Sequence, residues 1–227
     1  MSRYLIEVKK VKKNFNHKNG LVEIFKNVSL GVKAGDLVAL VGPSGSGKST
    51  FLHLLSFLDK PTSGQILFLG KDSKNFNEDE KDEIRRRKIS IIFQDNNLLS
   101  DFTTMENVIM PLMIRGEDYK SSLIKAKNVL KDVHLSERKN HFPNELSGGE
   151  QQRVAIARSL AANTKIILAD EPTGNLDYKS TSEVFTYFQK LKQKNKTILI
   201  ATHNRELAKK ADYTLSLRDG NIKRLNG

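Results

Sequence analysis

Short apolar runs rich in β-branched residues recur along the chain, with longer and more polar segments between them. Four such runs have the length of buried strands: residues 37–41, 89–93, 165–170 and 197–202. Continuous apolar runs of this length are typical of strands that are covered on both faces. One intervening segment carries apolar residues at helical spacing: Val184, Phe185, Phe188 and Leu191. The alternation of strands and helices predicts a mostly parallel sheet with helices on both faces.

The first third of the chain also contains segments in which apolar and polar residues alternate. The clearest are 5–8, 21–25 and 64–70, and a turn-like segment at 16–20 separates the first two. Alternation with period two indicates strands that have one solvated face. We therefore expect an antiparallel sheet beside the parallel one. A small closing hairpin is expected around the Asp219-Gly220 turn near the end of the chain.

Between residues 95 and 162 the apolar positions recur mainly at helical spacing. Pro111 interrupts the apolar segment 108–114 and should kink or end a helix there. Ser147, followed three residues later by Glu150, has the form of a capping box. This box predicts that a helix starts at the two glycines between them.

The 227 residues suffice for one large domain, and the sequence lacks repeats, low-complexity linkers and heptad runs. We expect one domain over residues 4–227, with the helical region, approximately 95–162, inserted in it. Apolar runs are far shorter than the roughly 20 residues that span a bilayer, and the first residues lack the apolar core of a signal peptide. There is no cysteine, which excludes disulfides and thiolate metal sites and fits a cytosolic protein. The net charge of +12 would suit nucleic acid or an anionic membrane, but lysines spread over solvated faces explain it better.

The most informative stretch is Gly42-Pro43-Ser44-Gly45-Ser46-Gly47-Lys48-Ser49, which follows an apolar run and leads into a helix-like segment from Thr50. It fits the G-x-x-x-x-G-K-[ST] phosphate-binding loop in full. Its glycines let backbone N–H groups approach phosphate oxygens, and the helix start adds its positive dipole end. Lys48 is suited to bridge the β- and γ-phosphates, and Ser49 to bind Mg²⁺. A glycine-rich turn that only caps a helix is the alternative.

Two carboxylates, Asp170 and Glu171, come where a buried run ends. Ligands of open α/β sheets bind at the carboxyl ends of the parallel strands. Asp170 is therefore a candidate for holding Mg²⁺, through its water shell. Glu171, one residue nearer the γ-phosphate, is suited to orient an attacking water or to accept its proton. Without the phosphate loop, two acidic residues at a loop entrance would be an equally good interpretation.

Three further residues are ambiguous when each is taken alone. Gln94 and His203 each follow an apolar run. The Gln94 amide would reach the metal or the water, and the His203 N–H would donate to a γ-phosphate oxygen. Isolated residues of these types are nevertheless more often ordinary surface or core residues. Phe15, just before the turn-like segment, would stack on adenine or fill the core, and by itself the core interpretation is better.

The helix start at Ser147, Gly148 and Gly149 is a second candidate anion site, because its N–H groups and helix dipole point the same way. One nucleotide hardly needs two phosphate sites in one chain. The simplest physical solution is a dimer, in which this helix start covers the γ-phosphate bound by Lys48 of a second copy. An ordinary helix cap is the alternative.

Together, these residues resemble the ATP-binding cassette (ABC) ATPases. The matching segments, in the family's order, are 42–49, Gln94, Leu146-Ser147-Gly148-Gly149-Glu150, 166–171, Asn175-Leu176-Asp177 and His203. They cover nearly the whole chain, and Leu-Ser-Gly-Gly-Glu is diagnostic of that family. The resemblance implies an α/β P-loop NTPase fold, with a RecA-like core, an antiparallel β subdomain and an inserted α-helical subdomain. It also implies a head-to-tail homodimer that sandwiches two ATP molecules.

The resemblance assigns roles to individual residues. It implies that the catalytic residues are Lys48, Gln94, Glu171 and His203, and that the Mg²⁺ ligands are Ser49, Gln94 and Asp170. ATP would be bound by residues 42–50 and by Phe15, where the family often has Tyr, so stacking would survive but a hydroxyl contact would not. The partner's ATP would be contacted by Ser147, Gly148, Gly149 and Glu150. Asp177 would touch the opposite subunit, and Gln94 would couple the nucleotide to a transmembrane partner.

Other segments look like the subgroup that serves lipoprotein release and macrolide-type export: 51–55, 58–64, 97–103, 106–108 and 169–177. This likeness implies an ATPase subunit on the cytoplasmic side of a bacterial inner membrane, powering lipoprotein release. Its partners would be a second copy and separately encoded permease subunits, with no direct contact to nucleic acid and none to the membrane except through them. The alternatives are an efflux or cell-division ATPase with the same site, and a soluble nucleic-acid-associated ATPase.

Overall fold

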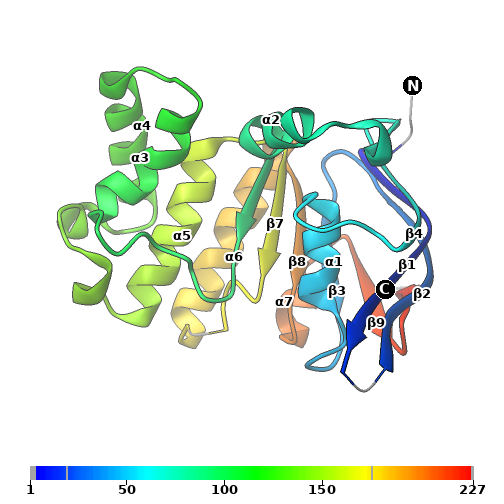
Figure 1. Ribbon diagram of the computed structural model, residues 1–227. Coiled ribbons are helices and arrows are strands. Elements are labelled where there is room, and N and C mark those ends of the chain that lie inside the picture. The colour runs from blue at the N-terminus through cyan, green and yellow to red at the C-terminus, as the bar shows by residue number, and fades with distance from the viewer. Residues whose placement is uncertain (1–3, 19, 175, 226–227) are drawn as a thin grey trace.

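The structure is a computed structural model that describes residues 4–18, 20–174 and 176–225 (Figure 1). Its centre is a six-stranded sheet with strand order β10-β9-β3-β8-β7-β6. The strands are β3 (Leu37–Val41), β6 (Ile89–Ile92), β7 (Ile166–Asp170), β8 (Thr197–Ala201), β9 (Tyr213–Arg218) and β10 (Asn221–Leu225). Neighbours pair in parallel except β9 and β10, which form the closing hairpin. The prediction of a mostly parallel sheet is confirmed.

Successive residues of the central strands pack against different layers, as the period of two requires. Val38 belongs to an apolar cluster with α1 (Lys48–Leu55), whereas its neighbour Leu37 packs with Phe185 and other residues of α6 (Tyr178–Gln193). The sheet is therefore covered on both faces, which explains why its strands are uninterrupted apolar runs.

A second, antiparallel sheet has strand order β2-β1-β4-β5 and lies beside the central one (Figure 1). Its strands are β1 (Ile6–His17), β2 (Gly20–Val32), β4 (Ser63–Phe68) and β5 (Lys71–Asp72). The pairing of β1 with β2 shifts register on both sides of Lys13, and such bulges re-aim side chains. The predicted antiparallel sheet is confirmed, and β1 ends and β2 begins within the segment 16–20 that was predicted to separate them.

Three helices between β6 and β7 pack around an apolar cluster of their own: α3 (Thr104–Ile114), α4 (Tyr119–Asp132) and α5 (Gly148–Ala162). The helix α3 contains Pro111 and continues to Ile114, so an ending at Pro111 is wrong. The proline lies in the last turn, where it removes one hydrogen bond, and Leu112 beyond it is buried in the cluster.

The remaining elements are shorter or more polar. α2 (Glu78–Lys88) precedes β6, and three 3₁₀ turns cover Ser73–Asn75, Ser136–Arg138 and Pro143–Glu145. α7 (Arg205–Lys209), capped by Asn204, was not predicted, because one polar turn carries no helical periodicity. Within the described ranges, no helix combines the length and the apolar character needed to cross a bilayer.

Candidate functional site

The segment between β3 and α1 folds into a tight loop at the start of the helix. Gly47 precedes α1 with a left-handed φ of 102°, and no side chain caps the helix. A Cβ on Gly47 would lie 2.6 Å from Ile24 Cγ2, and one on Gly42 would lie 2.5 Å from the carbonyl oxygen of Leu217. Glycine is therefore required at both positions. The uncapped N–H groups of the first turn are the arrangement that binds phosphate.

Lys48 is buried beneath this loop, with 8% of the residue exposed. Its Nζ donates to the carbonyl oxygens of Gly42 at 3.1 Å and Pro43 at 3.3 Å, and it lies 3.8 Å from Glu171 Oε1. The ammonium group is thus held beneath the loop by two neutral carbonyl oxygens. A phosphate oxygen would give it an ionised acceptor and a stronger hydrogen bond.

Glu171 follows β7 directly and takes a left-handed φ of 44°. Its Oε2 accepts from the backbone N–H of His203 at 3.2 Å and lies 3.0 Å from His203 Nδ1. The Glu171 N–H donates to the Ala201 carbonyl at 2.9 Å, which ties the turn to β8. The carboxylate is therefore held at the carboxyl edge of the sheet between Lys48, from the start of α1, and His203, from the end of β8.

Asp170, the last residue of β7, is 8% exposed. Burial raises the pKa of its carboxyl group, while a hydrogen bond from Ser49 and the charge of Lys48 oppose that rise. The Ser49 hydroxyl and the Asp170 carboxylate therefore lie next to each other, and each offers an oxygen atom to a metal ion. A cation at this position would favour the ionised carboxylate and offset the cost of its burial.

These residues meet in one open cavity of about 520 Å³, within the range of small-molecule sites. Its lining is Ile24, Ser44, Gly45, Gly47, Lys48, Ser49, Thr50, Gln94, Asp170, Glu171, Gly174 and His203. Gly42, Pro43 and Ser46, which were also predicted to bind ATP, lie outside this lining, and the Ser46 hydroxyl oxygen is buried without a hydrogen-bond partner. Two lining residues, Ile24 and Gly174, were not predicted. Ile24 comes from the other sheet, and nothing in its own segment signals a ligand.

The donor set at the cavity fits a magnesium ion that arrives with a nucleotide. In the part of the chain that the structure describes, no group of three or more His, Asp or Glu side chains could hold a metal by itself. Mg²⁺ typically keeps several waters and uses one or two carboxylates together with substrate phosphates. Ser49, Gln94 and Asp170 could supply the few protein ligands that Mg²⁺ uses beside waters and phosphates.

The segment after Gln94 is anchored to the helical region. Arg158, on α5, donates to the carbonyl oxygens of Asn96 and Asn97, each at 2.7 Å. Both asparagines take left-handed φ values, 59° and 45°. Desolvation of the largely buried guanidinium lowers the pKa of Arg158. Gln94 therefore lies between the cavity and a fixed point on α5.

The predicted helix start at Ser147 is present, with a complete capping box. Glu150 N–H donates to Ser147 Oγ at 3.3 Å, and Glu150 Oε2 accepts from the Ser147 N–H at 2.9 Å and its hydroxyl at 3.0 Å. Arg138 Nε donates to Glu150 Oε1 at 2.9 Å. The Ser147 N–H and, to a smaller extent, Arg138 lower the pKa of Glu150. None of these residues lines the cavity, and β7 and β8 lie between α5 and α1 in Figure 1.

The remaining predicted residues also lie outside the cavity lining. Asp177 is the N-cap of α6, and its side chain accepts from the Ser180 N–H at 2.9 Å. Phe15 lies near the end of β1, opposite Val22, with 42% of the residue exposed, so it does not fill the core. Asn175, part of a family-matching segment, lies outside the described residues.

Comparisons with a family model, with known sequences and with solved structures all point to the same protein family. Residues 25–174 match the family model described as ABC transporter. The chain is 46% identical to the "Lipoprotein-releasing system ATP-binding protein LolD" of Rickettsia typhi, covering 97% of this chain and 98% of that protein. It is 45% identical to the protein of the same name from Acinetobacter baylyi, covering 97% of each. A solved dimeric bacterial ABC transporter cassette superposes with a TM-score of 0.92 at 39% identity, over 98% of this chain and 99% of that one. A dimeric post-hydrolysis cassette bound to ADP and Pi gives 0.92 at 38% identity, with the same coverage.

Proposed function

The chain belongs to the ABC transporter family and is an ATP-binding ATPase of that family, and we propose that it powers the release of lipoproteins from a bacterial inner membrane. The proposal rests on the name shared by relatives from Rickettsia and Acinetobacter, which align over nearly the full length of both chains. In this function the chain sits on the cytoplasmic side of the membrane. It is held there by separately encoded permease subunits.

The observation that carries the chemistry is the position of the Glu171 carboxylate between Lys48 Nζ and His203 Nδ1. Residues 42–50 bind the triphosphate, and Lys48 compensates the charge of its β- and γ-phosphates. Ser49, Gln94 and Asp170 hold Mg²⁺, which supplies further charge compensation when bound. Phe15 stacks on the adenine base.

Glu171 acts as the base that orients the attacking water and accepts its proton. Its carboxylate lies within contact distance of both Lys48 and His203. A γ-phosphate at the loop would give Lys48 and the His203 N–H new acceptors. Glu171 would then be released toward the water, so ATP itself would assemble the catalytic arrangement.

A second copy of the chain completes the site. Ser147, Gly148, Gly149 and Glu150 lie outside the cavity of their own chain, yet they form an exposed helix start suited to an anion. In the proposed homodimer this start covers the γ-phosphate bound by the other copy, and Asp177 lies at the dimer contact. The dimeric cassettes with the same fold support this arrangement.

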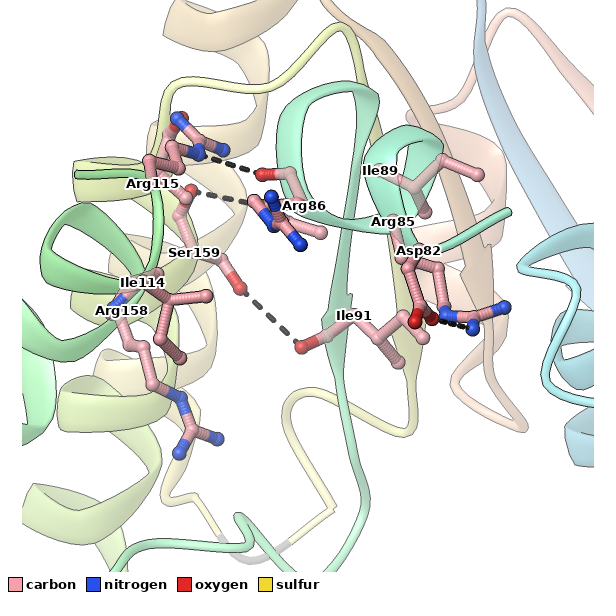
Figure 2. A pocket seen from close by; sticks show the side chains of 12 residues that line it. Asp82, Arg85, Arg86, Ile89, Ile91, Ile114, Arg115, Arg158 and Ser159 are labelled. Carbon is pink, nitrogen blue, oxygen red and sulfur yellow. Dashed lines mark hydrogen bonds and ion pairs between the residues drawn. The ribbon is translucent and has the colours of Figure 1, made fainter. Parts of the chain in front are cut away.

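The permease is proposed to dock in the groove between α2–β6 and α3–α5 (Figure 2). This groove encloses about 450 Å³ and includes Ile91, Ile114, Arg115 and Arg158 in its lining. Arg158 also holds the carbonyl groups of Asn96 and Asn97, two and three residues after Gln94. A segment bound in the groove would thus contact the same side chain that positions the Gln94 segment, which links the permease to the nucleotide.

The decisive test of the chemistry is Glu171→Gln. This variant is expected to keep ATP binding and to lose hydrolysis, because the amide cannot accept the proton. Glu78→Gln makes the same change on a side chain that is 79% exposed on α2 and serves as the control. ATP binding and steady-state phosphate release are measured for both. Turnover of Glu171→Gln near that of the control would exclude Glu171 as the base.

The test of the partner is copurification in detergent. A membrane protein with four transmembrane spans and a large periplasmic domain is expected to copurify with the chain. Ile114→Asp is expected to abolish that copurification without changing the ATPase activity of the isolated chain, because Ile114 lies in the groove and is 60% exposed. The matched control is Ile124→Asp, since Ile124 is 61% exposed on α4 outside the groove.

The test of the cargo is transport. Spheroplasts depleted of the chain are expected to retain lipoproteins in the inner membrane, and the restored chain should release them. Unchanged lipoprotein release together with lost drug export or impaired division would replace the proposal by the efflux or division alternative. Salt-sensitive stimulation of the ATPase by nucleic acid would replace it by the soluble alternative.

A further inference from the structure

We propose that Lys13 is a positioning residue for adenine, which fixes the Phe15 ring relative to the phosphate-binding helix α1. This inference rests on the proposed stacking role of Phe15. The Lys13 ammonium lies over the Phe15 ring, with Nζ 4.5 Å from the ring centroid, within the distance of a cation–π contact. Phe15 is 42% exposed, so the ring is still accessible to a base.

The Lys13 side chain is only 8% exposed, which is rare for a lysine. Buried lysines usually have a paired charge. Its Nζ donates to Asp59 Oδ1 at 2.6 Å and to the Lys60 carbonyl at 3.0 Å. One ammonium group therefore contacts an aromatic ring, a carboxylate and a carbonyl at the same time. In β1, Val11 and Lys13 are buried and Lys12 between them is exposed, so Lys13 points inward by the ordinary alternation of a strand.

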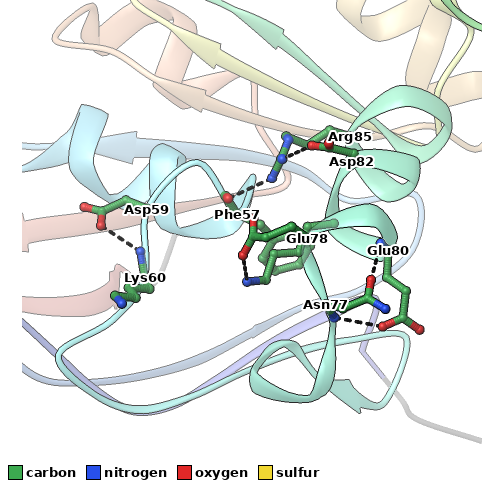
Figure 3. A network of polar contacts seen from close by, with 9 residues as sticks. Phe57, Asp59, Lys60, Asn77, Glu78, Glu80, Asp82 and Arg85 are labelled. Carbon is green, nitrogen blue, oxygen red and sulfur yellow. Dashed lines mark hydrogen bonds and ion pairs between the residues drawn. The ribbon is translucent and has the colours of Figure 1, made fainter.

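The Asp59 segment is tied to the end of the phosphate-binding helix. The backbone N–H groups of Leu58 and Asp59 both donate to the His53 carbonyl of α1, at 3.0 and 3.3 Å. The Lys60 N–H donates to Asp59 Oδ1 at 2.7 Å (Figure 3). The same carboxylate oxygen accepts from Lys13 Nζ. The carboxylate that receives Lys13 therefore moves with α1.

The same segment is also tied to β1. The Thr62 N–H donates to the Lys12 carbonyl at 2.9 Å, and the Asn14 N–H donates to Thr62 Oγ1 at 3.0 Å. The strand that carries Phe15 and the helix that begins at Lys48 are thus connected on both sides of Lys13. A continuous set of polar contacts sets the distance from the phosphate loop to the aromatic ring. The distance between a base stacked on Phe15 and a phosphate at the loop would therefore be fixed before the nucleotide binds.

The charge of Lys13 gives this link a property that a neutral side chain lacks. A cation over one ring face attracts the π electrons and holds the ring against rotation. An apolar residue at position 13 would contact the ring but would make no bond to Asp59 or Lys60. The expected signature of Lys13 is therefore an effect on ligands that contain a base and no effect on ligands that consist of phosphate alone.

The test compares ADP with inorganic pyrophosphate, using the full-length chain with Mg²⁺. ADP binding is measured by titration calorimetry, and pyrophosphate binding by displacement of ADP. Lys13→Met is expected to weaken ADP binding roughly fivefold, the scale of a partly buried cation–π contact, and to leave pyrophosphate binding unchanged. Lys12→Met is the matched control, because Lys12 is the exposed neighbour on the same strand.

Two further variants guard against a general loss of structure. Lys13→Arg keeps a cation over the ring and is expected to restore most of the ADP affinity. In a double-mutant cycle, Phe15→Leu alone is expected to weaken ADP binding, and Lys13→Met is expected to add nothing once the ring is absent. Thermal unfolding of each variant identifies any that fail to fold, and Asp59→Asn then supplies a milder disruption of the same link.

The outcomes distinguish the stacking role of Phe15 from the positioning role of Lys13. Unchanged ADP affinity in Phe15→Leu would overturn the proposed stacking role itself. A clear effect of Phe15→Leu with none of Lys13→Met would overturn the role of Lys13 alone. An equal loss of ADP and pyrophosphate binding in folded Lys13→Met would make Lys13 an ordinary structural ion pair and would also overturn the inference.

Discussion

The starts of α1 and α5 are both glycine-rich helix N-termini, yet they are built differently. α1 follows a left-handed Gly47, has no side-chain cap and no acidic residue in its first turn, and holds a buried lysine. α5 has a complete Ser147–Glu150 capping box and an acidic first turn, and Arg138 compensates that acid. The α1 start is therefore arranged to bind phosphate within its own chain. The α5 start satisfies the Ser147 and Glu150 N–H groups through the capping box, and only the N–H groups of the two glycines are left to face an anion from another chain.

In the proposed homodimer, this difference would let a single chain bind nucleotide and leave its hydrolysis to the dimer. In that scheme the phosphate loop, whose N–H groups have no side-chain cap, would bind the nucleotide first. The Ser147 hydroxyl donates to Glu150, so in the proposed homodimer it would have to turn to contact a γ-phosphate. Because that exchange costs one hydrogen bond for each one formed, the α5 start contributes little affinity until the partner's nucleotide is in place.

The largest effect is expected at the phosphate loop. Lys48→Met removes the ammonium from the β- and γ-phosphates, and we expect turnover to fall roughly 10²- to 10³-fold, as for loss of one electrostatic donor at a reacting group. Steady-state phosphate release measures this loss, with the melting temperature as a check on folding. Residual turnover close to that of the native chain would mean that the loop does not hold the reacting phosphates.

An intermediate effect is expected at the α5 start. Ser147→Ala should lower turnover about tenfold, the scale of one hydrogen bond to a charged group, and should leave ADP binding by the isolated chain unchanged. ATPase assays and calorimetry with ADP separate the two quantities. Weaker ADP binding would place Ser147 in the site of its own chain, and the contrast between the two helix starts would then fail.

Mixing two inactive variants tests whether the Lys48 loop of one chain meets the Ser147 helix start of another. A dimer of one Lys48→Met chain and one Ser147→Arg chain contains one fully damaged site and one intact site, provided that the two motifs meet across the interface. We expect part of the native ATPase activity to return on mixing. No recovery, in a mixture shown to contain mixed dimers, would indicate that both motifs act within one chain.

The smallest effect concerns the charge of Glu150. Its pKa is lowered in the folded chain, so its ionised form contributes stability that is present above the ordinary glutamate pKa and is lost as the pH falls through the folded value. Glu150→Gln keeps a capping side chain but loses the charge, so we expect a loss of about 0.3–1 kcal/mol in unfolding free energy at neutral pH. Urea unfolding from pH 7 to pH 3 measures it, and the difference between the two proteins should shrink as the pH falls.

Much of the fold was predictable from periodicity. The four buried runs became β3, β6, β7 and β8, because only strands covered on both faces tolerate uninterrupted apolar residues. The Ser147 helix start was predictable because a capping box is a local interaction. The short helix α7 and the passage of α3 through Pro111 were not, since both depend on packing that local sequence does not encode.

The sequence by itself determined the order of the strands and helices and the chemical groups that follow each strand, because these depend on interactions between residues close together in the chain. Only the tertiary structure decided that Glu171 lies between Lys48 and His203, that Ile24 from the other sheet reaches the same cavity, and that Lys13 joins Phe15 to Asp59. Except for the contact of Lys13 with Phe15, these contacts join residues far apart in sequence. Their distances follow from strand order and side-chain packing, which a pattern of residue types does not specify.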